Sequence, residues 1–380
     1  MIINANIWSG EEELLKLTSI LDEMGYKTPL YLIDKNLFEK SEYISDYIKS
    51  VKVDKMLMIY DHPFEPSYQM LDKMMDYARN KKIFGNVDVI VGIGGGSVLD
   101  TAKGLAILFK NSGEAIKYKG FPSNLEHPLP VIAIPSTTGT GSEVVYNASF
   151  IDEDTKVKMG INYKYNYPAV AILDPIIPSK APIRVLASSG CDALVHTLEA
   201  FMSIKSNSQV KFFSKRAYNL IIENMVPILK GNGQLKHWSN MQWAAVYAMF
   251  ALSNSTSGPT GALSYFLGAN YNVNHGLAGG VFIGKVCKYN HENGYFDLGD
   301  LLMENHKNSF KPEKRSAIVL AQIEELLSLA EIPKSLSVFG VNEDSFKGFQ
   351  DFSIKAKEAF SYNPIKIDLD QVSNYFINID

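Results

Sequence analysis

One stretch, residues 89–103, constrains the fold of this chain more than any other. It reads VIVGIGGGSVLDTAK, a continuous apolar run followed by three consecutive glycines and a helix-compatible run that continues to Lys110. The apolar run is typical of a buried parallel strand, and Ser97 is a candidate N-cap of the helix that follows. The pattern therefore predicts a strand, a glycine turn and a helix start, in that order.

Such a turn can bind an anion, because glycine lets the backbone approach a ligand closely and the N–H groups at a helix start face it. The strict dinucleotide fingerprint G-x-G-x-x-G is absent, since the sixth position counted from Gly92 is Ser97. Spacing alone leaves two interpretations open, a phosphate-binding loop and a glycine-rich turn without a ligand.

The first half of the chain alternates short apolar runs with helical patterns. We expect strands at 29–33, 55–60, 129–134 and 170–173, helices at 11–24 and 67–80, and a hairpin of 144–151 with 156–162. This alternation predicts a parallel sheet that is covered on both faces. Ligands of such sheets bind beyond the carboxyl ends of the strands.

Helical periods dominate the second half of the chain, where strand signals almost vanish. The clearest helical stretches are 184–202, 210–229, 241–252 and 316–330. The proline-dense segment 174–182 separates the two patterns. We therefore expect an α/β domain at residues 1–180 and an all-α domain at residues 181–380.

Composition limits the partners and the compartment. The formal net charge is −4 and the pI is about 6.0, which does not favour nucleic acid or an anionic membrane as a partner. No apolar stretch reaches the length of a membrane span. The two cysteines, Cys191 and Cys287, make no disulfide framework and fit a reducing cytosol. A cytoplasmic protein is expected.

A possible metal site lies in the second half. Asp192 and His196 are four residues apart on a predicted helix, so their side chains leave the same face. His275 stands before Gly276 at the start of another helical stretch. A carboxylate and imidazoles on facing helices can hold a divalent cation. The alternatives are an ordinary surface pair and a hydrogen-bonded core histidine.

A second loop, IPSTTGTGSE at 134–143, follows the predicted strand 129–134. Its hydroxyl groups and glycines can hydrogen-bond a ribose, a phosphate or an amide, although a plain Ser/Thr-rich turn has the same composition. Two such loops after two parallel strands favour one shared ligand.

Four blocks of the sequence resemble the iron-dependent (group III) alcohol dehydrogenases. Residues 94–103 resemble their G-G-G-S-x-x-D-x-A-K block, and 135–143 resemble P-T-T-x-G-T-G-S-E. Residues 192–196 resemble D-A-L-x-H, and His275-Gly276 resembles a later H-G. The order and spacing of the four blocks agree across nearly the whole chain.

The resemblance implies a dinucleotide-binding α/β domain followed by a helical metal and substrate domain, the architecture of dehydroquinate synthases. It also implies hydride transfer between a nicotinamide cofactor and a small alcohol or aldehyde, in a homodimer. Asp34 would favour NAD over NADP, because a carboxylate there binds the ribose 2′-hydroxyl. The other residues it places at the cofactor are Gly94, Gly95, Gly96, Ser97, Asp100, Thr137, Thr138 and Lys158.

The chain departs from the family pattern at the metal. The resemblance assigns Asp192, His196 and His275 as ligands of Fe²⁺ or Zn²⁺, but Gly261 stands where the family has a third histidine. Tyr265 replaces a further family histidine near the substrate. A metal could therefore bind with an extra open position. Alternatively, the site lacks metal, and Tyr265 or His275 stabilises the developing alkoxide.

The most direct interpretation is an NAD(P)-dependent alcohol dehydrogenase or aldehyde reductase, with His275, Tyr265 and Asn147 near the substrate. Asn147 could instead be a strand asparagine bonded to a neighbouring loop. Two other classes stay open: a lyase like dehydroquinate synthase, and a cofactor-binding protein that has lost catalysis, suggested by Gly261.

Overall fold

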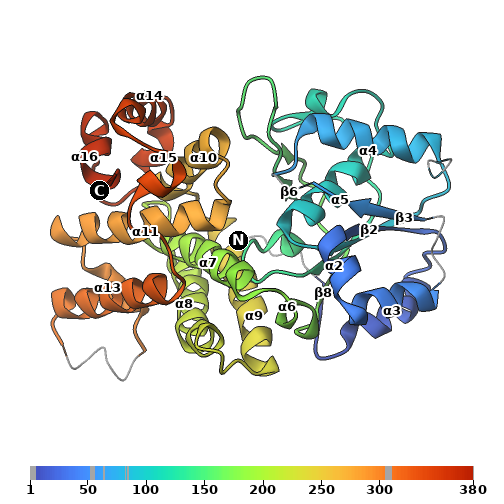
Figure 1. Ribbon diagram of the computed structural model, residues 1–380, viewed down its shortest axis with the longest axis horizontal. Helices are drawn as coiled ribbons and strands as arrows, with labels where there is room; N and C mark the ends of the chain where they lie inside the picture. Colours follow the sequence, from blue (N-terminus) through green and yellow to red (C-terminus); the bar gives the residue numbers. More distant parts are fainter. Residues whose placement is uncertain are drawn as a thin grey trace. The chain divides into compact units, whose positions relative to one another are not determined.

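The computed structural model describes residues 6–51, 56–62, 65–81, 83, 85–303 and 310–379. The chain forms two compact units, one of which ends at Ala181 while the other begins at Pro182. Figure 1 labels many of the helices and strands of the two units.

Six parallel strands form the sheet of the first unit, in the order β1-β8-β5-β4-β2-β3. Their bounds are β1 (Ile7–Ser9), β2 (Pro29–Asp34), β3 (Leu57–Tyr60), β4 (Val89–Gly94), β5 (Val131–Pro135) and β8 (Val170–Leu173). The predicted parallel sheet is confirmed. The expected first residue of β3, Lys55, lies outside the described residues. Because β4 lies between β5 and β2, the glycine loop leaves an interior strand of the sheet.

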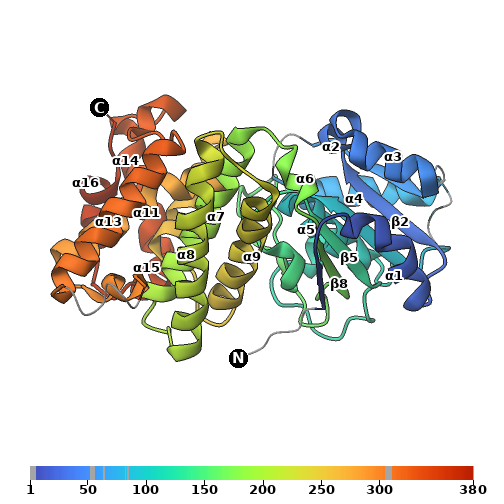
Figure 2. The same ribbon diagram turned by 90° about the horizontal axis from the view of Figure 1, so that it is seen from below.

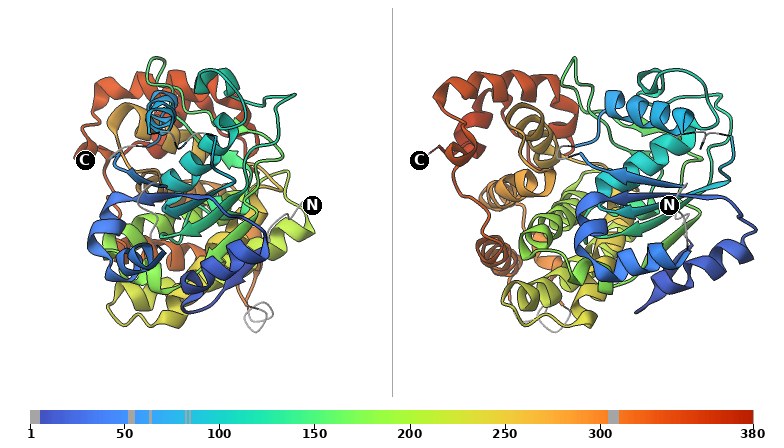
Figure 3. Two further views of the ribbon diagram at one scale, coloured as in Figure 1. Left: turned by 90° about the vertical axis from the view of Figure 1, so that its right-hand side faces the viewer. Right: turned by 45° about the vertical axis from the view of Figure 1, so that its right-hand side comes forward.

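Both faces of this sheet are buried. Along β2, Leu30 and Leu32 join the apolar cluster of one face, while Tyr31 and Ile33 join that of the other. Helices α4 (Tyr68–Asn80) and α5 (Gly96–Leu108) contribute to the first cluster, and α1 (Leu17–Glu23) and α3 (Glu42–Val51) to the second. The left panel of Figure 3 shows the strands between these layers. The alternation of side chains along each strand thus places helices on both faces.

Several elements of this unit differ from the expectation. The predicted helix 11–24 begins only at Glu13, because Glu12 has a φ of 63°, and it starts as a 3-10 turn, η1 (Glu13–Lys16), that leads directly into α1. Two short helices, α2 (Lys35–Lys40) and α3, follow β2 without having been predicted. The remaining short elements are η2 (Ala115–Tyr118), η3 (Ser142–Val144) and α6 (Ile176–Ser179).

The predicted hairpin is present but its strands are much shorter than expected. Only β6 (Asn147–Ala148) and β7 (Ile161–Asn162) pair as a regular antiparallel ladder. Ile151 forms isolated bridges with both Ser67 and Lys158, so it belongs to no long strand. The turn itself is held by Asp152, whose carboxylate accepts hydrogen bonds from the backbone of 154 and 155.

The second unit is helical, as predicted. Its α-helices are α7 (Ile183–Met202), α8 (Ser208–Leu229), α9 (Leu235–Leu252), α10 (Pro259–Tyr271), α11 (His275–Glu292), α13 (Pro312–Leu329), α14 (Phe346–Lys355), α15 (Lys357–Ser361) and α16 (Val372–Phe376). Short 3-10 turns are η4 (Asp297–Leu301), η5 (Leu336–Phe339), η6 (Glu343–Ser345) and η7 (Leu369–Gln371). One apolar cluster draws on most of these helices.

Helix α7 lies at the centre of the unit, packed against α8, α9 and α11. Figure 2 shows α7, α8 and α9 side by side. Two helices begin several residues earlier than expected: α9 starts after a capping box at Gln234, and α13 starts with Pro312 in its first turn. Within the described parts of the chain, no helix combines the length and apolar character needed to cross a bilayer.

Candidate active site

The glycine loop forms a tight turn between β4 and α5. Helix α5 begins at Gly96 with Gly95 as its N-cap, so the prediction that Ser97 is the N-cap is wrong by two residues. A Cβ at Gly94 would lie 2.5 Å from Val98 Cγ2, and one at Gly96 would lie 2.6 Å from Thr140 Cγ2. The helix start therefore packs too closely for side chains at either position.

The start of α5 is suited to an anion. Among the described residues, no side chain caps the first N–H groups of this helix. These groups and the helix dipole favour a phosphate at this end. Gly94, Gly95, Gly96 and Ser97 thus lie where the sequence places a pyrophosphate, at the carboxyl end of β4.

The second loop lies beside the first. The Thr137 methyl group would be 3.3 Å from a Cβ on Gly95, so the two loops are in contact. Thr138 is buried, with 1% of its surface exposed, whereas Thr137 is half-buried. Of the two predicted hydroxyl groups, that of Thr137 is therefore the better placed to reach a ligand.

Asp100 and Lys103 anchor these loops from within. Asp100 accepts hydrogen bonds from Ser142 Oγ at 2.5 Å and from the backbone N–H of Ser149 at 2.9 Å, and its carboxylate lies 3.1 Å from Lys103 Nζ. The fully buried Lys103 also donates to the carbonyls of Ser142 and Asn147. Asp100 thus has an internal structural role, and nothing in these contacts supports the predicted cofactor contact.

Glu143 is a buried carboxyl group beside this network. It is 2% exposed, and burial raises its pKa to about 7, an effect that its own backbone N–H and Lys103 oppose. The folded chain therefore holds a proton that the unfolded chain releases near its ordinary pKa of about 4.3. The corresponding stabilisation is complete below that pH and is lost as pH rises toward 7.

Replacing Glu143 with glutamine tests this pH dependence. Glutamine stays neutral at every pH. The free energy of unfolding of Glu143→Gln minus that of wild type is therefore expected to increase from pH 5 to pH 8, by on the order of 1–3 kcal/mol. Urea unfolding at both pH values measures the difference. The exposed Glu223→Gln serves as the control and is expected to show no such trend. A difference between Glu143→Gln and wild type that does not change with pH would contradict the argument.

Two further predicted cofactor residues lie in different surroundings. Asp34 is at the carboxyl end of β2, beside the end of β4, and Lys158 is in the segment between β6 and β7. Asp34 ends β2 and caps α2, where its Oδ1 accepts the Leu37 N–H at 2.9 Å, and its contact with a ribose stays a prediction. Lys158 Nζ lies 2.7 Å from Glu65 Oε2 and is mostly buried. The ammonium group is thus already paired with a carboxylate, and its contact with a ribose stays a prediction.

Asn147, predicted near the substrate, has a partner in the neighbouring strand. Its Nδ2 donates to Asn162 Oδ1 at 2.6 Å, and the two residues are opposite each other in the β6–β7 pair. The contact agrees with the alternative of a structural strand asparagine, although the neighbour is a strand and not a loop.

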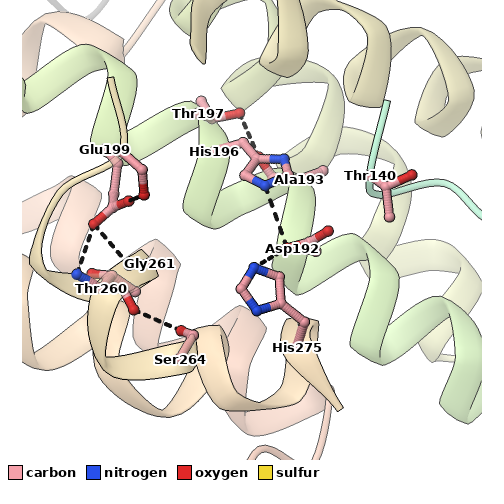
Figure 4. A network of polar contacts seen from close by, with 12 residues as sticks. Thr140, Asp192, Ala193, His196, Thr197, Glu199, Thr260, Gly261, Ser264 and His275 are labelled. Carbon is pink, nitrogen blue, oxygen red and sulfur yellow. Dashed lines mark hydrogen bonds and ion pairs between the residues drawn. The ribbon is translucent and has the colours of Figure 1, made fainter. Parts of the chain in front are cut away.

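The predicted metal ligands do come together in the helical unit. Asp192 and His196 lie one turn apart on α7, and His275 is the first residue of α11. The Nε2 atoms of His196 and His275 lie 3.5 Å and 3.9 Å from Asp192 Oδ1, and the three donor atoms are within 4.8 Å of one another. Figure 4 shows both rings directed at the one carboxylate.

This donor set fits a divalent cation. The two N···O distances exceed an ordinary hydrogen bond. Ligands about 2.1 Å from a tetrahedral ion lie about 3.4 Å apart, close to the observed separations. A carboxylate and two imidazoles suit Fe²⁺ or Zn²⁺. His196 Nδ1 is buried and has no hydrogen-bond partner in the described part of the chain, so packing and the Nε2 contact with Asp192 orient that ring.

Gly276 explains how His275 reaches Asp192. A Cβ at Gly276 would collide with the carbonyl of Ser188 and lie 3.1 Å from Asp192 Cβ. Asn274 caps α11 by accepting the Gly276 N–H at 3.1 Å, and it also accepts a hydrogen bond from Ser188 Oγ. The H-G pair thus combines a donor with the close helix contact that positions it.

Gly261 and Tyr265 lie on α10. A side chain at Gly261 would collide with Ser257 Oγ, so this position supplies no ligand and its surroundings leave no space for one. The Tyr265 ring stacks on His275, with centroids 4.8 Å apart and planes at 18°. Tyr265 is therefore next to the predicted ligands, and it is 37% exposed.

The two halves of the chain match the two halves of one enzyme family. The model of iron-containing alcohol dehydrogenases matches residues 4–175, and the C-terminal model of the same family matches residues 186–378. The chain belongs to the iron-containing alcohol dehydrogenase family. It is an oxidoreductase that interconverts alcohols and aldehydes with a nicotinamide cofactor.

Individual relatives agree over nearly the full length. The chain is 28% identical to the 1,3-propanediol dehydrogenase of Klebsiella pneumoniae, over 93% of this chain and 91% of the relative. It is 28% identical to the NAD-dependent methanol dehydrogenase of Bacillus methanolicus, over 92% and 90%. A solved 1,3-propanediol oxidoreductase structure superposes with a TM-score of 0.87 at 26% identity, covering 99% of both chains.

Proposed function

We propose that this chain reduces a small aldehyde with NADH, or oxidises the corresponding alcohol with NAD, and that one divalent cation is held by Asp192, His196 and His275. The convergence of these three donors carries the proposal. A methanol dehydrogenase among the relatives is NAD-dependent, which supports NAD as the cofactor. When bound, the nicotinamide supplies hydride transfer and the cation polarises the substrate oxygen.

The residues of the chain bind and orient these groups. The N–H groups at the start of α5, those of Gly96 and Ser97, bind the pyrophosphate, and Asp34 accepts a hydrogen bond from the ribose 2′-hydroxyl. The carboxylate of Asp192 compensates the charge of a cation, and the neutral imidazoles complete the donor set. Tyr265, with its ring on His275, is placed to hydrogen-bond the substrate oxygen.

Turnover with aldehydes tests the proposed reaction. Purified protein is expected to oxidise NADH in the presence of a short-chain aldehyde, and more rapidly after Fe²⁺ or Zn²⁺ is added. Absorbance at the nicotinamide band measures the rate. Binding of NADH without turnover across an aldehyde panel, with and without either ion, would contradict the proposal.

Asp34 is expected to set the choice between NAD and NADP. The variant Asp34→Ser keeps an oxygen that can cap α2 but removes the charge that repels a 2′-phosphate. We expect the ratio of kcat/KM for NADH over NADPH to fall by about 10-fold or more, equivalent to about 1.4 kcal/mol. The ratio is measured from initial rates with both cofactors. An unchanged ratio in Asp34→Ser, or equal use of both cofactors by wild type, would refute this role.

The proposal includes a cytoplasmic homodimer. Cys191 and Cys287 are free and buried, which suits a reducing compartment. Sedimentation equilibrium of the purified protein measures the number of subunits, and a mass of one chain across the concentration range would reject the dimer.

A further inference from the structure

A second acidic residue lies on the helix that carries two of the metal donors. Glu199 follows His196 by three residues and Asp192 by seven, so all three leave the same face of α7. Only 4% of Glu199 is exposed. Its carboxylate is not among the three converging donors, and the reaction proposed above makes no use of it.

The carboxylate of Glu199 binds the start of α10. Its Oε1 accepts the N–H groups of Thr260 at 2.7 Å and Gly261 at 3.2 Å. Its Oε2 accepts the Gly258 N–H at 2.9 Å and the Ser257 hydroxyl at 2.7 Å. Figure 4 shows the carboxylate above this first helical turn. A charged acceptor at a helix N-terminus forms strong hydrogen bonds and also interacts favourably with the helix dipole.

These contacts account for the missing fourth donor. A Cβ at Gly261 would collide with Ser257 Oγ and lie 3.2 Å from Glu199 Oε2. Glu199 and Ser257 thus fill the space that a side chain at this position would need. The cation then depends on three donors, and the orientation of each becomes more critical.

Helix α10 connects Glu199 with the third donor. Tyr265 lies five residues after Thr260 on this helix, and its ring stacks on His275. His196 has no anchor at Nδ1 in the described part of the chain, so this site lacks the outer hydrogen bond that usually fixes a ligating histidine there. The stacked Tyr265 ring limits how far the His275 ring can turn.

We propose that Glu199 is a positioning residue of the metal site: by fixing the first turn of α10 it holds Tyr265 against His275, and so holds the third donor in place. This inference rests on the proposed function, because it requires that Asp192, His196 and His275 bind a cation. Glu199 itself acts through α10 and not as a ligand.

Cobalt binding to the full chain tests the inference. In Glu199→Gln, an amide NH₂ replaces one acceptor oxygen opposite the N–H groups of α10. We expect Co²⁺ affinity, measured by calorimetry, to fall about 10–100-fold, as is typical for outer-shell partners of metal ligands. The visible d–d absorption of bound Co²⁺ is expected to change shape, because the donor geometry changes. Ser257→Ala, which keeps the carboxylate, is expected to show the same effects more weakly.

A matched variant separates positioning from general destabilisation. Asn207 caps α8 in the same unit by accepting the N–H groups of Gln209 and Val210. Asn207→Ala is expected to lower the unfolding midpoint while leaving Co²⁺ affinity and absorption as in wild type. If Glu199→Gln and Ser257→Ala bind Co²⁺ with wild-type affinity and absorption, the role of Glu199 is overturned while the proposed metal site stands. A wild-type chain that binds no Co²⁺ would refute the metal site and this inference with it.

Discussion

Asp192→Ala is expected to lose its bound divalent ion and at least about 1000-fold in kcat/KM, or about 4 kcal/mol of transition-state stabilisation. Asp192 supplies the only negative charge in the donor set and lies between the two imidazoles, 3.5 Å and 3.9 Å from their Nε2 atoms. Its removal leaves two neutral donors on separate helices, which bind a cation far more weakly. Elemental analysis of protein purified without chelators measures the ion independently of activity.

The control for this variant is Asp297→Ala. Asp297 forms an exposed ion pair with Lys211 in the same helical unit, and it is expected to keep both ion and activity. Circular dichroism checks that each variant is folded. A folded Asp192→Ala protein that retains one ion per chain would show that the ion binds elsewhere. Retained activity without any ion would instead favour stabilisation of the alkoxide by Tyr265 or His275.

Gly276→Ala is expected to destabilise the chain by about 2–4 kcal/mol and to weaken the metal site as well. The added methyl group meets the backbone carbonyl of Ser188, which cannot move without shifting α7. Since α7 carries Asp192 and α11 carries His275, separating the helices also separates the donors. Chemical denaturation and Co²⁺ titration measure the two effects.

Gly284→Ala is the matched variant on the same helix. A Cβ at Gly284 would lie 3.2 Å from a terminal methyl group of Leu327, which can adjust. Alanine in a helix interior is favoured over glycine by about 0.5–1 kcal/mol. Gly284→Ala is therefore expected to be near neutral and to bind Co²⁺ as wild type does. Similar stability in the two variants would contradict the importance of the close contact at Gly276.

Features encoded by local pattern were predictable from the sequence. The buried strands, the long helices and the glycine turn depend on residues close together in the chain, and the structure contains all of them. Errors occurred where the backbone departs from the simplest pattern. Gly95, not Ser97, caps α5 because the helix already begins at Gly96. The left-handed conformation of Glu12 keeps the first two residues of the expected helix, 11 and 12, out of the helical segment.

Features that depend on distant contacts could not be read from the sequence. Glu199 gave no signal, because the four groups that bind it lie about sixty residues later and three of them are backbone N–H groups. For Gly261, the resemblance showed only that a metal donor is missing at this position. The surrounding side chains in the structure show why no donor fits there. Asp100 belongs to a recognisable block, yet its contacts are internal to the fold.

Diffraction from crystals grown with Fe²⁺ and NAD, recorded at the iron absorption edge, tests the central claim most directly. The account predicts one anomalous peak within bonding distance of Asp192, His196 and His275, and nucleotide density with its pyrophosphate at Gly94–Ser97. Nucleotide bound at the loop without an anomalous peak at these three side chains would contradict the metal site. A loop without nucleotide at saturating NAD would contradict the account as a whole.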